Sequence, residues 1–283
     1  MSAASTHTRA RPVDPSDAGR LMRLLESGFG GSSDPLTNHL LLDALDRREF
    51  ARFVVWPPAD PIGVLYIGAS ASVVAAGDPA AGPALAGEAE RADWRVLLGD
   101  AAACQAILEA TAKGLFRRRH TAREQRFMAA TKTSGSTSVE GLRRAHSGDL
   151  ERLTDFACRL HVEDRMGPPI SRAGRSAVRS RMHHSITAGA TWVIQRRGRP
   201  VAKIDLPLRS RRRGAQIAGV YVEEAWRGRG IATAAVGALV SHLLTEERLP
   251  AVSLHVRADN EPALRAYRRA GLTDRGPWLL ALR

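Results

Sequence analysis

The segment Val220-Tyr-Val-Glu-Glu-Ala-Trp-Arg227-Gly-Arg-Gly230-Ile-Ala232 decides how the second half of this 283-residue chain folds. An apolar run of strand type, Ile217 to Val222, breaks into a basic, glycine-rich turn, and a helical pattern follows at once. Such a junction directs several backbone N–H groups and the positive end of a helix dipole at one point. The segment therefore predicts a site for a phosphate-bearing ligand.

The composition is that of an ordinary globular protein, with 44% hydrophobic and 25% charged residues. No apolar run reaches the roughly 18 to 20 residues that a membrane span needs, and Met1 to His7 lacks the apolar core of a signal peptide. Cys104 and Cys158 fall in different helical patterns, so neither a disulfide nor a metal site is expected. We therefore expect no membrane partner and a cytoplasmic location.

The formal net charge of +13 raises the question of a nucleic-acid partner. Nearly all the positive charge is arginine, and it is concentrated around one expected hairpin, at Arg196 to Arg199 and Arg209 to Arg213. No aromatic residues that could stack on bases alternate with these arginines. An anionic cofactor is the favoured partner, and binding to RNA, including tRNA-linked chemistry, is the disfavoured alternative.

A small, polar segment, Thr131 to Ser138, has no apolar periodicity and is typical of a linker. It divides the chain into expected domains 1–134 and 139–283, each near the usual size of a single domain. Both halves show the same order of elements, which indicates a duplication of fold without retained sequence similarity. The fold class is α/β (α+β), in two tandem domains with a mixed, mostly antiparallel sheet flanked by helices.

The periodicity of apolar residues gives the expected elements of each half. In the second half the expected strands are 139–145, 191–195, 201–206, 216–222, 251–256 and 278–282, and the expected helices are 149–162, 173–188, 231–247 and 262–270. In the first half the expected strands are 8–13, 53–56, 62–67, 72–76, 95–98 and 126–130, and the expected helices are 18–28, 35–48, 80–91 and 101–118.

Two motifs carry a resemblance to a known family. Arg227-Gly-Arg-Gly230-Ile-Ala232 fits the signature Arg/Gln-x-x-Gly-x-Gly/Ala. Downstream, Asn260-Glu-Pro-Ala263-Leu-Arg-Ala-Tyr267-Arg-Arg-Ala-Gly271-Leu272 resembles the block Asn-x-x-Ala-x-x-x-Tyr-x-x-x-Gly-Phe, with leucine in place of phenylalanine. The region 139–283 thus resembles the GNAT N-acetyltransferases. The tandem layout, with a degenerate first copy, is similar to two-domain actinobacterial proteins of that family.

The resemblance implies a site for acetyl-CoA, used as a co-substrate. The backbone N–H groups from Arg227 to Ala232 would hold the pyrophosphate, and the edge of the preceding strand would pair with the pantetheine arm. Asn260 caps its helix in this reading, with or without a contact to the pantetheine. When the first motif is considered without the second, the alternative to a phosphate site is a glycine turn that only joins the strand to the helix. The implied cofactor-binding residues are Val220, Tyr221, Val222, Arg227, Gly228, Arg229, Gly230, Ile231, Ala232 and Asn260.

Tyr267 resembles the family's general acid, which protonates or hydrogen-bonds the departing thiolate. The base is less defined, because Gln216 and Ile217 occupy the strand positions where many members carry a carboxylate. Glu223, beside the loop, could act through water or be a solvated turn residue. Glu163 and Asp164, between the first two helices, are further candidates.

We expect an acetyl-CoA-dependent N-acetyltransferase that moves an acetyl group to a primary amine by direct attack. The amine could belong to a small molecule or to a protein, and the oligomeric state is open. The alternative is a non-catalytic protein that senses acyl-CoA or binds a partner. In the first half, Asp78 and Pro79 stand where the phosphate loop should be, and no arginine is present. That half is expected not to bind coenzyme A.

Overall fold

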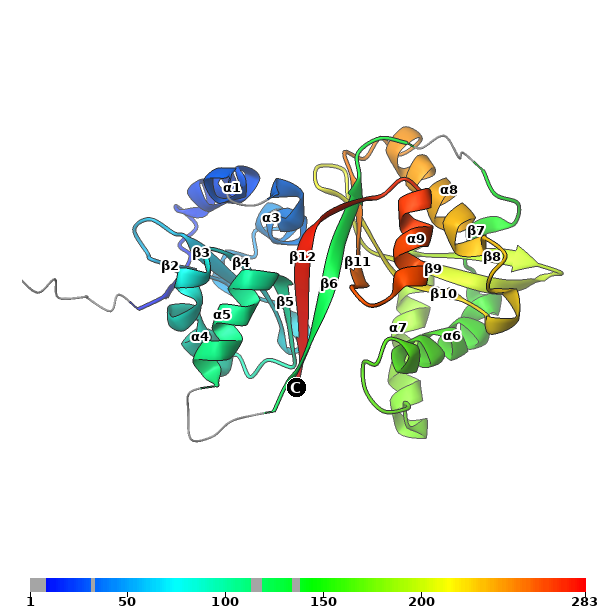
Figure 1. The fold of residues 1–283 in the computed structure, drawn as a ribbon, viewed down its shortest axis with the longest axis horizontal. Helices are drawn as coiled ribbons and strands as arrows, with labels where there is room; N and C mark the ends of the chain where they lie inside the picture. Colours follow the sequence, from blue (N-terminus) through cyan, green and yellow to red (C-terminus); the bar gives the residue numbers. More distant parts are fainter. Residues whose placement is uncertain (1–8, 32–33, 113–118, 134–137) are drawn as a thin grey trace, which may run out of the picture. The chain divides into compact units, whose positions relative to one another are not determined.

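The computed structural model describes residues 9–31, 34–112, 119–133 and 138–283, which form two compact units. Unit 1 comprises Met1–Gln125 together with Gly276–Arg283, and unit 2 comprises Arg126–Arg275. The N-terminal residues 1–8, the end of the helix expected over 101–118 and part of the expected linker 131–138 lie outside the described residues. The chain passes from one unit to the other twice, within strands β6 and β12 (Figure 1).

Unit 1 contains a sheet with the strand order β1-β2-β3-β4-β5-β12. Strands β4 and β5 run parallel, and the other pairs of this sheet run antiparallel. Its elements are β1 (Arg11–Pro12), α1 (Ala18–Glu26), α2 (Gly28–Gly31), α3 (His39–Asp46), β2 (Phe53–Trp56), β3 (Gly63–Ile67), β4 (Ser72–Gly77), α4 (Gly82–Arg91), β5 (Val96–Asp100), α5 (Ala101–Thr111) and the larger part of β12 (Thr273–Leu282).

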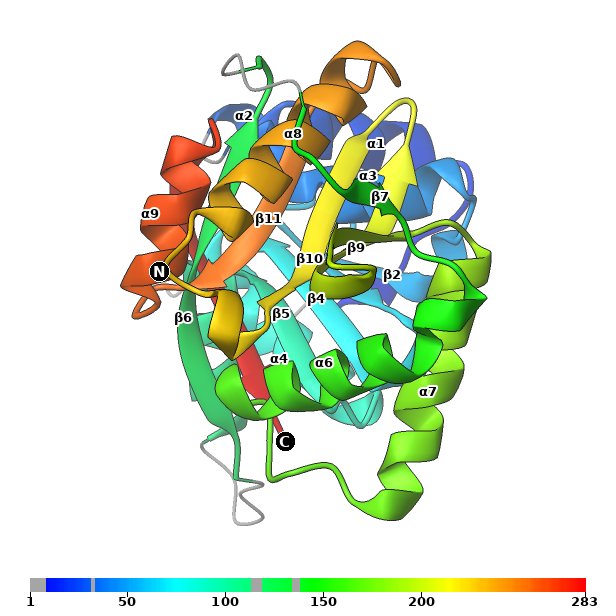
Figure 2. The ribbon, with the colours of Figure 1, turned by 90° about the vertical axis from the view of Figure 1, so that its right-hand side faces the viewer.

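Unit 2 contains a sheet with the order β6-β11-β10-β9-β8-β7, seen face-on in Figure 2. Here β10 and β11 are parallel, whereas β7, β8, β9 and β10 pair antiparallel in succession. Its elements are β6 (Thr121–Ala130) from Arg126 onward, β7 (Leu142–Arg144), α6 (Leu150–Glu163), α7 (Arg172–Thr187), β8 (Thr191–Arg196), β9 (Arg199–Ser210), β10 (Gly214–Val222), α8 (Ile231–Thr245), β11 (Val252–Arg257) and α9 (Glu261–Arg269).

Two separate apolar clusters cover the two faces of the sheet of unit 2. One joins strand residues such as Ile217 and Leu254 to α8 and α9 through Leu239 and Leu264. The other joins Val193 and Tyr221 to α6 and α7 through Phe156 and Met182. Since alternate residues of a strand point to opposite faces, each residue of β10 is directed toward one helix pair or the other. Ile217 and Tyr221 are four residues apart, so uninterrupted alternation would place them on the same face. The register shifts on either side of Ala218 instead place Tyr221 on the α6 and α7 face.

The expected fold class is confirmed, with mixed, mostly antiparallel strands flanked by helices in each unit. Most of the expected elements appear within a few residues of their bounds, although the first strand of each half is shorter than expected. Two assignments were wrong. The strand expected over 126–130 in the first domain lies in unit 2, and the strand expected over 278–282 in the second domain lies in unit 1. The units are thus not the contiguous segments 1–134 and 139–283, because periodicity shows that a strand exists but not which sheet it joins.

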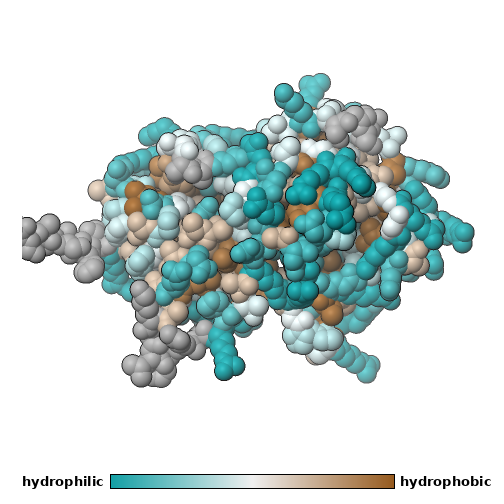
Figure 3. Space-filling view, in the orientation of Figure 1, coloured by the Kyte–Doolittle hydropathy of each residue, from teal (hydrophilic) through white to brown (hydrophobic). Residues whose placement is uncertain are grey.

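Hydrophilic side chains cover the larger part of the face drawn in Figure 3, densely over α9. That helix exposes Arg265, Arg268 and Arg269. Among the described residues, no helix is both long and apolar enough to span a bilayer.

Candidate functional site

The glycine-rich turn after β10 leads into α8 through a left-handed backbone. Gly228 and Gly230 have φ angles of +73° and +72°, which L side chains rarely adopt, so this turn requires glycine at both positions. A Cβ built on either residue would meet no atom within 4 Å. The turn is therefore constrained by backbone conformation, while the space in front of it is open.

The N-terminus of α8 carries unused backbone donors. Its first backbone hydrogen bond runs from the N–H of Ala234 to the carbonyl of Gly230, at 3.0 Å. Gly230 occupies the N-cap position and provides no side-chain oxygen to the first turn. The N–H groups of Ile231, Ala232 and Thr233 thus have no intrahelical acceptor, and the helix dipole adds partial positive charge at the same place. This end of α8 is suited to bind an anion.

The two arginines of the turn behave differently. The guanidinium of Arg229 lies 5.1 Å from the centre of the Trp226 ring, and the residue is exposed. Arg227 instead folds back: its Nε donates to the carbonyl of Val222 at 2.9 Å, and its Nη2 lies 2.8 Å from both carboxylate oxygens of Glu163. Arg227 therefore fixes the turn to the end of α6, and Arg229 is the arginine left to meet a ligand.

Strand β10 presents an open edge just before the turn. Its parallel pairing with β11 covers Ala215 to Ile217 and stops at the pair Ile217–Leu254. Pairing with β9 continues to Val222, with register shifts on either side of Ala218. Residues 218–222 are thus hydrogen-bonded on one side only, which leaves backbone groups of Val220 to Val222 facing the gap where β10 and β11 diverge. An extended ligand could add to this edge as a strand does.

Glu163 connects both sides of this gap. Its carboxylate pairs with Arg227 after β10, and its carbonyl accepts a hydrogen bond of 2.8 Å from Nη1 of Arg257 at the end of β11. Glu163, at the C-terminus of α6, is therefore engaged on both its side chain and its backbone. These contacts make Glu163 a clasp between the turn after β10 and the end of β11.

The other carboxylate expected as a base is also paired. Both oxygens of Glu223 lie 2.8 Å from Nη2 of Arg152 in α6, and the Glu223 side chain is 18% exposed. The Nε of Arg152 also donates to the carbonyl of Pro200, and its guanidinium lies 5.1 Å from the ring centre of Phe156. No pattern in the sequence distinguishes Arg152, because one arginine on an amphipathic helix looks like a solvated residue.

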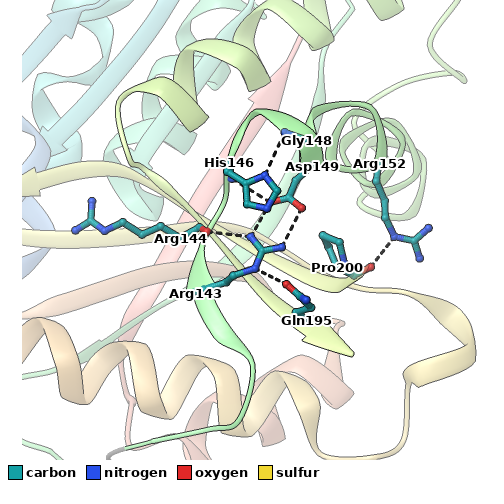
Figure 4. A network of polar contacts seen from close by, with 8 residues as sticks. All are labelled: Arg143, Arg144, His146, Gly148, Asp149, Arg152, Gln195 and Pro200. Atoms are coloured by element: carbon teal, nitrogen blue, oxygen red, sulfur yellow. Dashed lines mark hydrogen bonds and ion pairs between the residues drawn. The ribbon is translucent and has the colours of Figure 1, made fainter. Parts of the chain in front are cut away.

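The start of α6 is anchored by a second network (Figure 4). Arg143 of β7 holds the two oxygens of Asp149 at 2.7 and 3.0 Å, and Asp149 also accepts from the backbone N–H of His146 at 3.0 Å. Burial of Asp149 opposes ionisation, but these hydrogen bonds outweigh it, so the pKa of its carboxyl lies below the ordinary value. Arg143 also binds the side chain of Gln195 in β8. The helix that carries Glu163 is thus fixed at both ends.

A partly buried charge pair supports the irregular part of β10. Lys203 is 1% exposed and pairs with Asp205, whose other oxygen accepts from the hydroxyl of Thr191 at 3.0 Å. Gly219 covers the pair with a φ of +56°, and a Cβ there would lie 2.3 Å from Asp205 Oδ2 and 2.8 Å from Lys203 Nζ. The sequence does mark this pair, because Lys203 and Asp205 are the two charged residues of the otherwise apolar strand 201–206. The sequence-based prediction did not include the pair.

Tyr267 and Asn260 lie on α9. The side chain of Asn260 accepts from the N–H of Ala263 at 3.3 Å, so it caps the helix as expected. Tyr267 is 8% exposed, and its hydroxyl forms no hydrogen bond with any residue in the described part of the chain. Burial and, to a lesser extent, the charge of Asp164 raise the pKa of this phenol. Tyr267 therefore stays protonated at neutral pH and has a proton to donate.

The corresponding junction of unit 1 is closed. Parallel pairing of β4 with β5 reaches Ala75–Gly99, and β4 ends two residues later at Gly77. Asp78 accepts from the N–H of Ala80 at 2.8 Å, so its carboxylate occupies the place where an anion would bind. A Cβ on Gly82, the first residue of α4, would lie 2.5 Å from Ala106. This junction therefore has a shorter unpaired edge than β10, a carboxylate that caps the 3-10 turn Pro79–Ala81, and a helix start that is packed against Ala106.

Comparisons with known proteins agree with this architecture. Residues 158–272 match the sequence profile of the acetyltransferase (GNAT) family. A GCN5-related N-acetyltransferase from Sphaerobacter thermophilus has a TM-score of 0.63 at 19% identity, over 99% of this chain and 96% of the other. A GNAT-family acetyltransferase from Colwellia psychrerythraea has a TM-score of 0.57 at 14% identity, over 97% and 98% of the two chains.

A tandem GNAT protein from the clavulanic acid biosynthesis pathway is also similar, with a TM-score of 0.53 at 12% identity over 97% of both chains. No curated protein matches the chain in sequence. At these identities the solved structures establish the fold, which is GNAT-like along the full tandem arrangement. The profile match adds the family for the second half: the C-terminal half of this chain contains a GNAT acetyltransferase domain.

Proposed function

We propose that unit 2 binds acetyl-CoA and transfers its acetyl group to a primary amine by direct attack. The proposal rests foremost on the open edge of β10, which leads directly to the uncapped start of α8. Unit 1 provides an internal comparison, because its equivalent junction has a shorter unpaired edge, a carboxylate at the anion position and a packed helix start. A ligand with an extended arm and a pyrophosphate fits the first arrangement and not the second.

In this proposal the residues have distinct roles. The backbone of Gly228 to Ala232 holds the pyrophosphate, Arg229 adds charge, and residues Val220 to Val222 pair with the pantetheine arm. The amine nitrogen attacks the thioester carbonyl carbon, the carbon–sulfur bond of the tetrahedral intermediate breaks, and the thiolate takes a proton from the hydroxyl of Tyr267. Its raised pKa keeps that hydroxyl protonated until the thiolate forms.

For the two carboxylates we propose structural roles in place of the expected catalytic ones. Glu163 joins the turn after β10 to the end of β11, and Glu223 joins the same turn to α6. Arg227 likewise holds the turn in place and does not contact the coenzyme directly. The proton that the amine must lose before attack would pass to water or to another group near the gap.

Binding of acetyl-CoA, measured by calorimetry, tests the coenzyme site. The variant Gly230→Asp places a carboxylate at the anion site and should weaken binding about a hundredfold or more. Gly198→Asp is the matched control, because Gly198 also has a positive φ, +77°, with no atom within 4 Å of its Cβ position. Equal binding by both variants, or no saturable binding by the native protein, would refute the coenzyme site.

Turnover decides between the enzyme and the alternative, a protein that senses acyl-CoA or binds a partner without reaction. The alternative is favoured by one observation, the absence of a carboxylate at Gln216 and Ile217 of β10. Release of free thiol from acetyl-CoA, measured across a panel of primary amines, supports the enzyme if it depends on the amine. Tight coenzyme binding without amine-dependent release supports the alternative.

A further inference from the structure

Unit 1 contains a pocket of about 340 Å³ between α1 and the strand β2 with its following loop. Residues on one face of α1 form one wall of the pocket, and β2 with the loop that follows it forms the other. This volume lies within the range of small-molecule sites. The lining residues are Val13, Asp17, Arg20, Leu21, Arg23, Leu24, Ser27, Val55, Pro58, Asp60 and Pro61.

Two ion pairs hold the walls of this pocket in place. Arg20 reaches from α1 to the loop, where it binds the carbonyl of Ala59 and lies 2.7 Å from Asp60 Oδ1. On the same side, Arg11 lies 2.7 Å from Asp17 Oδ2. Both carboxylates of the lining are therefore neutralised by arginines of the protein itself. A cationic ligand would find no uncompensated negative charge there.

Arg23 is the remaining charged residue of the pocket lining. Unlike that of Arg20, its side chain forms no ion pair or hydrogen bond with any residue that the structure describes, and it is exposed at the margin of the pocket. The interior between the charged groups is apolar, with leucine, valine and proline side chains. The pocket thus combines an apolar body with one uncommitted guanidinium, which is a strong donor to carboxylates.

We propose that this pocket binds a small organic carboxylate with an apolar body, and that Arg23 recognises its carboxylate. The site lies wholly within unit 1 and does not depend on the proposed transferase activity. It gives the first unit a ligand of its own, chemically different from a coenzyme with phosphates.

Three probes that share one body and differ in their head group test the charge preference. We would titrate the full-length protein with 4-phenylbutyrate, 4-phenylbutanol and 4-phenylbutylamine by calorimetry. The carboxylate should bind about tenfold more tightly than the alcohol, because a charge-assisted hydrogen bond adds to the same apolar contact, and the amine should bind most weakly. Equal affinity for the three, or no binding of any, would overturn the proposal.

Variants of the protein test whether the probes bind in this pocket. Arg23→Gln should reduce the preference for the carboxylate over the alcohol to about one, whereas Arg48→Gln, an exposed arginine of the same unit outside the pocket, should leave it unchanged. Leu24→Trp fills the pocket from a half-buried position and should weaken all three probes, with its melting temperature checked for folding. Competition by acetyl-CoA, or loss of binding in Gly230→Asp, would place the probes in unit 2 and refute the proposal.

Discussion

The Nη2 atom of Arg227 lies 2.8 Å from both carboxylate oxygens of Glu163, although the two residues are 64 positions apart. This pair ties the turn that begins α8 to the end of α6. The Glu163 carbonyl binds Arg257 as well, so a single residue holds the turn after β10 and the end of β11 on the two sides of the gap. The geometry of the proposed coenzyme site therefore depends on the tip of another helix.

This clasp gives the first prediction, for Glu163→Gln. Because both partners are more than two-fifths exposed, the pair should contribute less than about 1 kcal/mol to stability. We expect the affinity for acetyl-CoA to fall by less than about tenfold, with kcat nearly unchanged. Steady-state kinetics check this, and a fall in kcat of a hundredfold at unchanged affinity would instead identify Glu163 as the base.

The pair of Arg152 and Glu223 is less exposed and should matter more for stability. A double-mutant cycle with Arg152→Gln and Glu223→Gln should give a coupling energy of about 1 to 3 kcal/mol in urea unfolding. The cycle for Arg227 and Glu163 should give a smaller value, since that pair is more accessible to water. Equal couplings in the two cycles would contradict the assignment of Glu223 to a structural role.

Tyr267→Phe should lower kcat about 10- to 100-fold without changing the affinity for acetyl-CoA, because it removes only the proton donor.

Since burial and the charge of Asp164 raise the pKa of Tyr267, the wild-type phenol should ionise above its ordinary value near 10. A spectrophotometric titration of wild type minus Tyr267→Phe measures this. Asp164→Asn should move that ionisation to lower pH, and no movement would show that Asp164 does not act on the phenol.

Gly219→Ala should be among the most destabilising glycine substitutions in unit 2. Its Cβ would overlap Asp205 and Lys203, whereas at Gly198 the same change meets open space at a similar backbone angle. Strain at positive φ costs about 1 kcal/mol at both sites, and displacement of the buried ion pair should add about 2 kcal/mol or more at Gly219. Urea unfolding of the two variants gives the difference, and equal stability would show that the pair moves freely.

The Asp149 network predicts a dependence on acid. Its carboxyl has a lowered pKa in the folded protein, so the folded state binds fewer protons than the unfolded state below about pH 4. The stability from this group is present above the unfolded pKa and is lost as pH falls through the folded value. Asp149→Asn should cost on the order of 2 kcal/mol at pH 7 and less at pH 3. A constant difference between these pH values would exclude the linkage.

Local features of the site could be predicted from the sequence, whereas its long-range partners could not. The break between strand and helix at Gly228 and Gly230 depends on residues that are adjacent in the chain, and so does the helix cap at Asn260. The partners of Glu163 and Glu223 come from distant elements, and neither Arg227 nor Arg152 is distinguished by its neighbours in the chain. The sequence therefore does not show that the carboxylates near the turn have partners, while the fold pairs them.

The same limit applies to the sheets. Alternating apolar residues predicted strands at 126–130 and 278–282, but the choice of sheet depends on pairing with β11 and β5. The open edge of β10 was expected as a binding surface from the resemblance. Its extent, from 218 to 222, follows from where the register with β11 ends, and no sequence pattern marks that point.

The passage of β6 and β12 between the units makes the two halves inseparable. Residues 126–130 belong to the sheet of unit 2, and residues 276–282 belong to the sheet of unit 1. A cut at residue 134 would remove a strand from beside β11, and it would leave the final strand of the chain without its partner β5. Deletion of residues 1–134 would therefore also take a strand from the sheet of unit 2, so the strand exchange makes the folding of each unit depend on a segment that the chain supplies from the other side of the boundary.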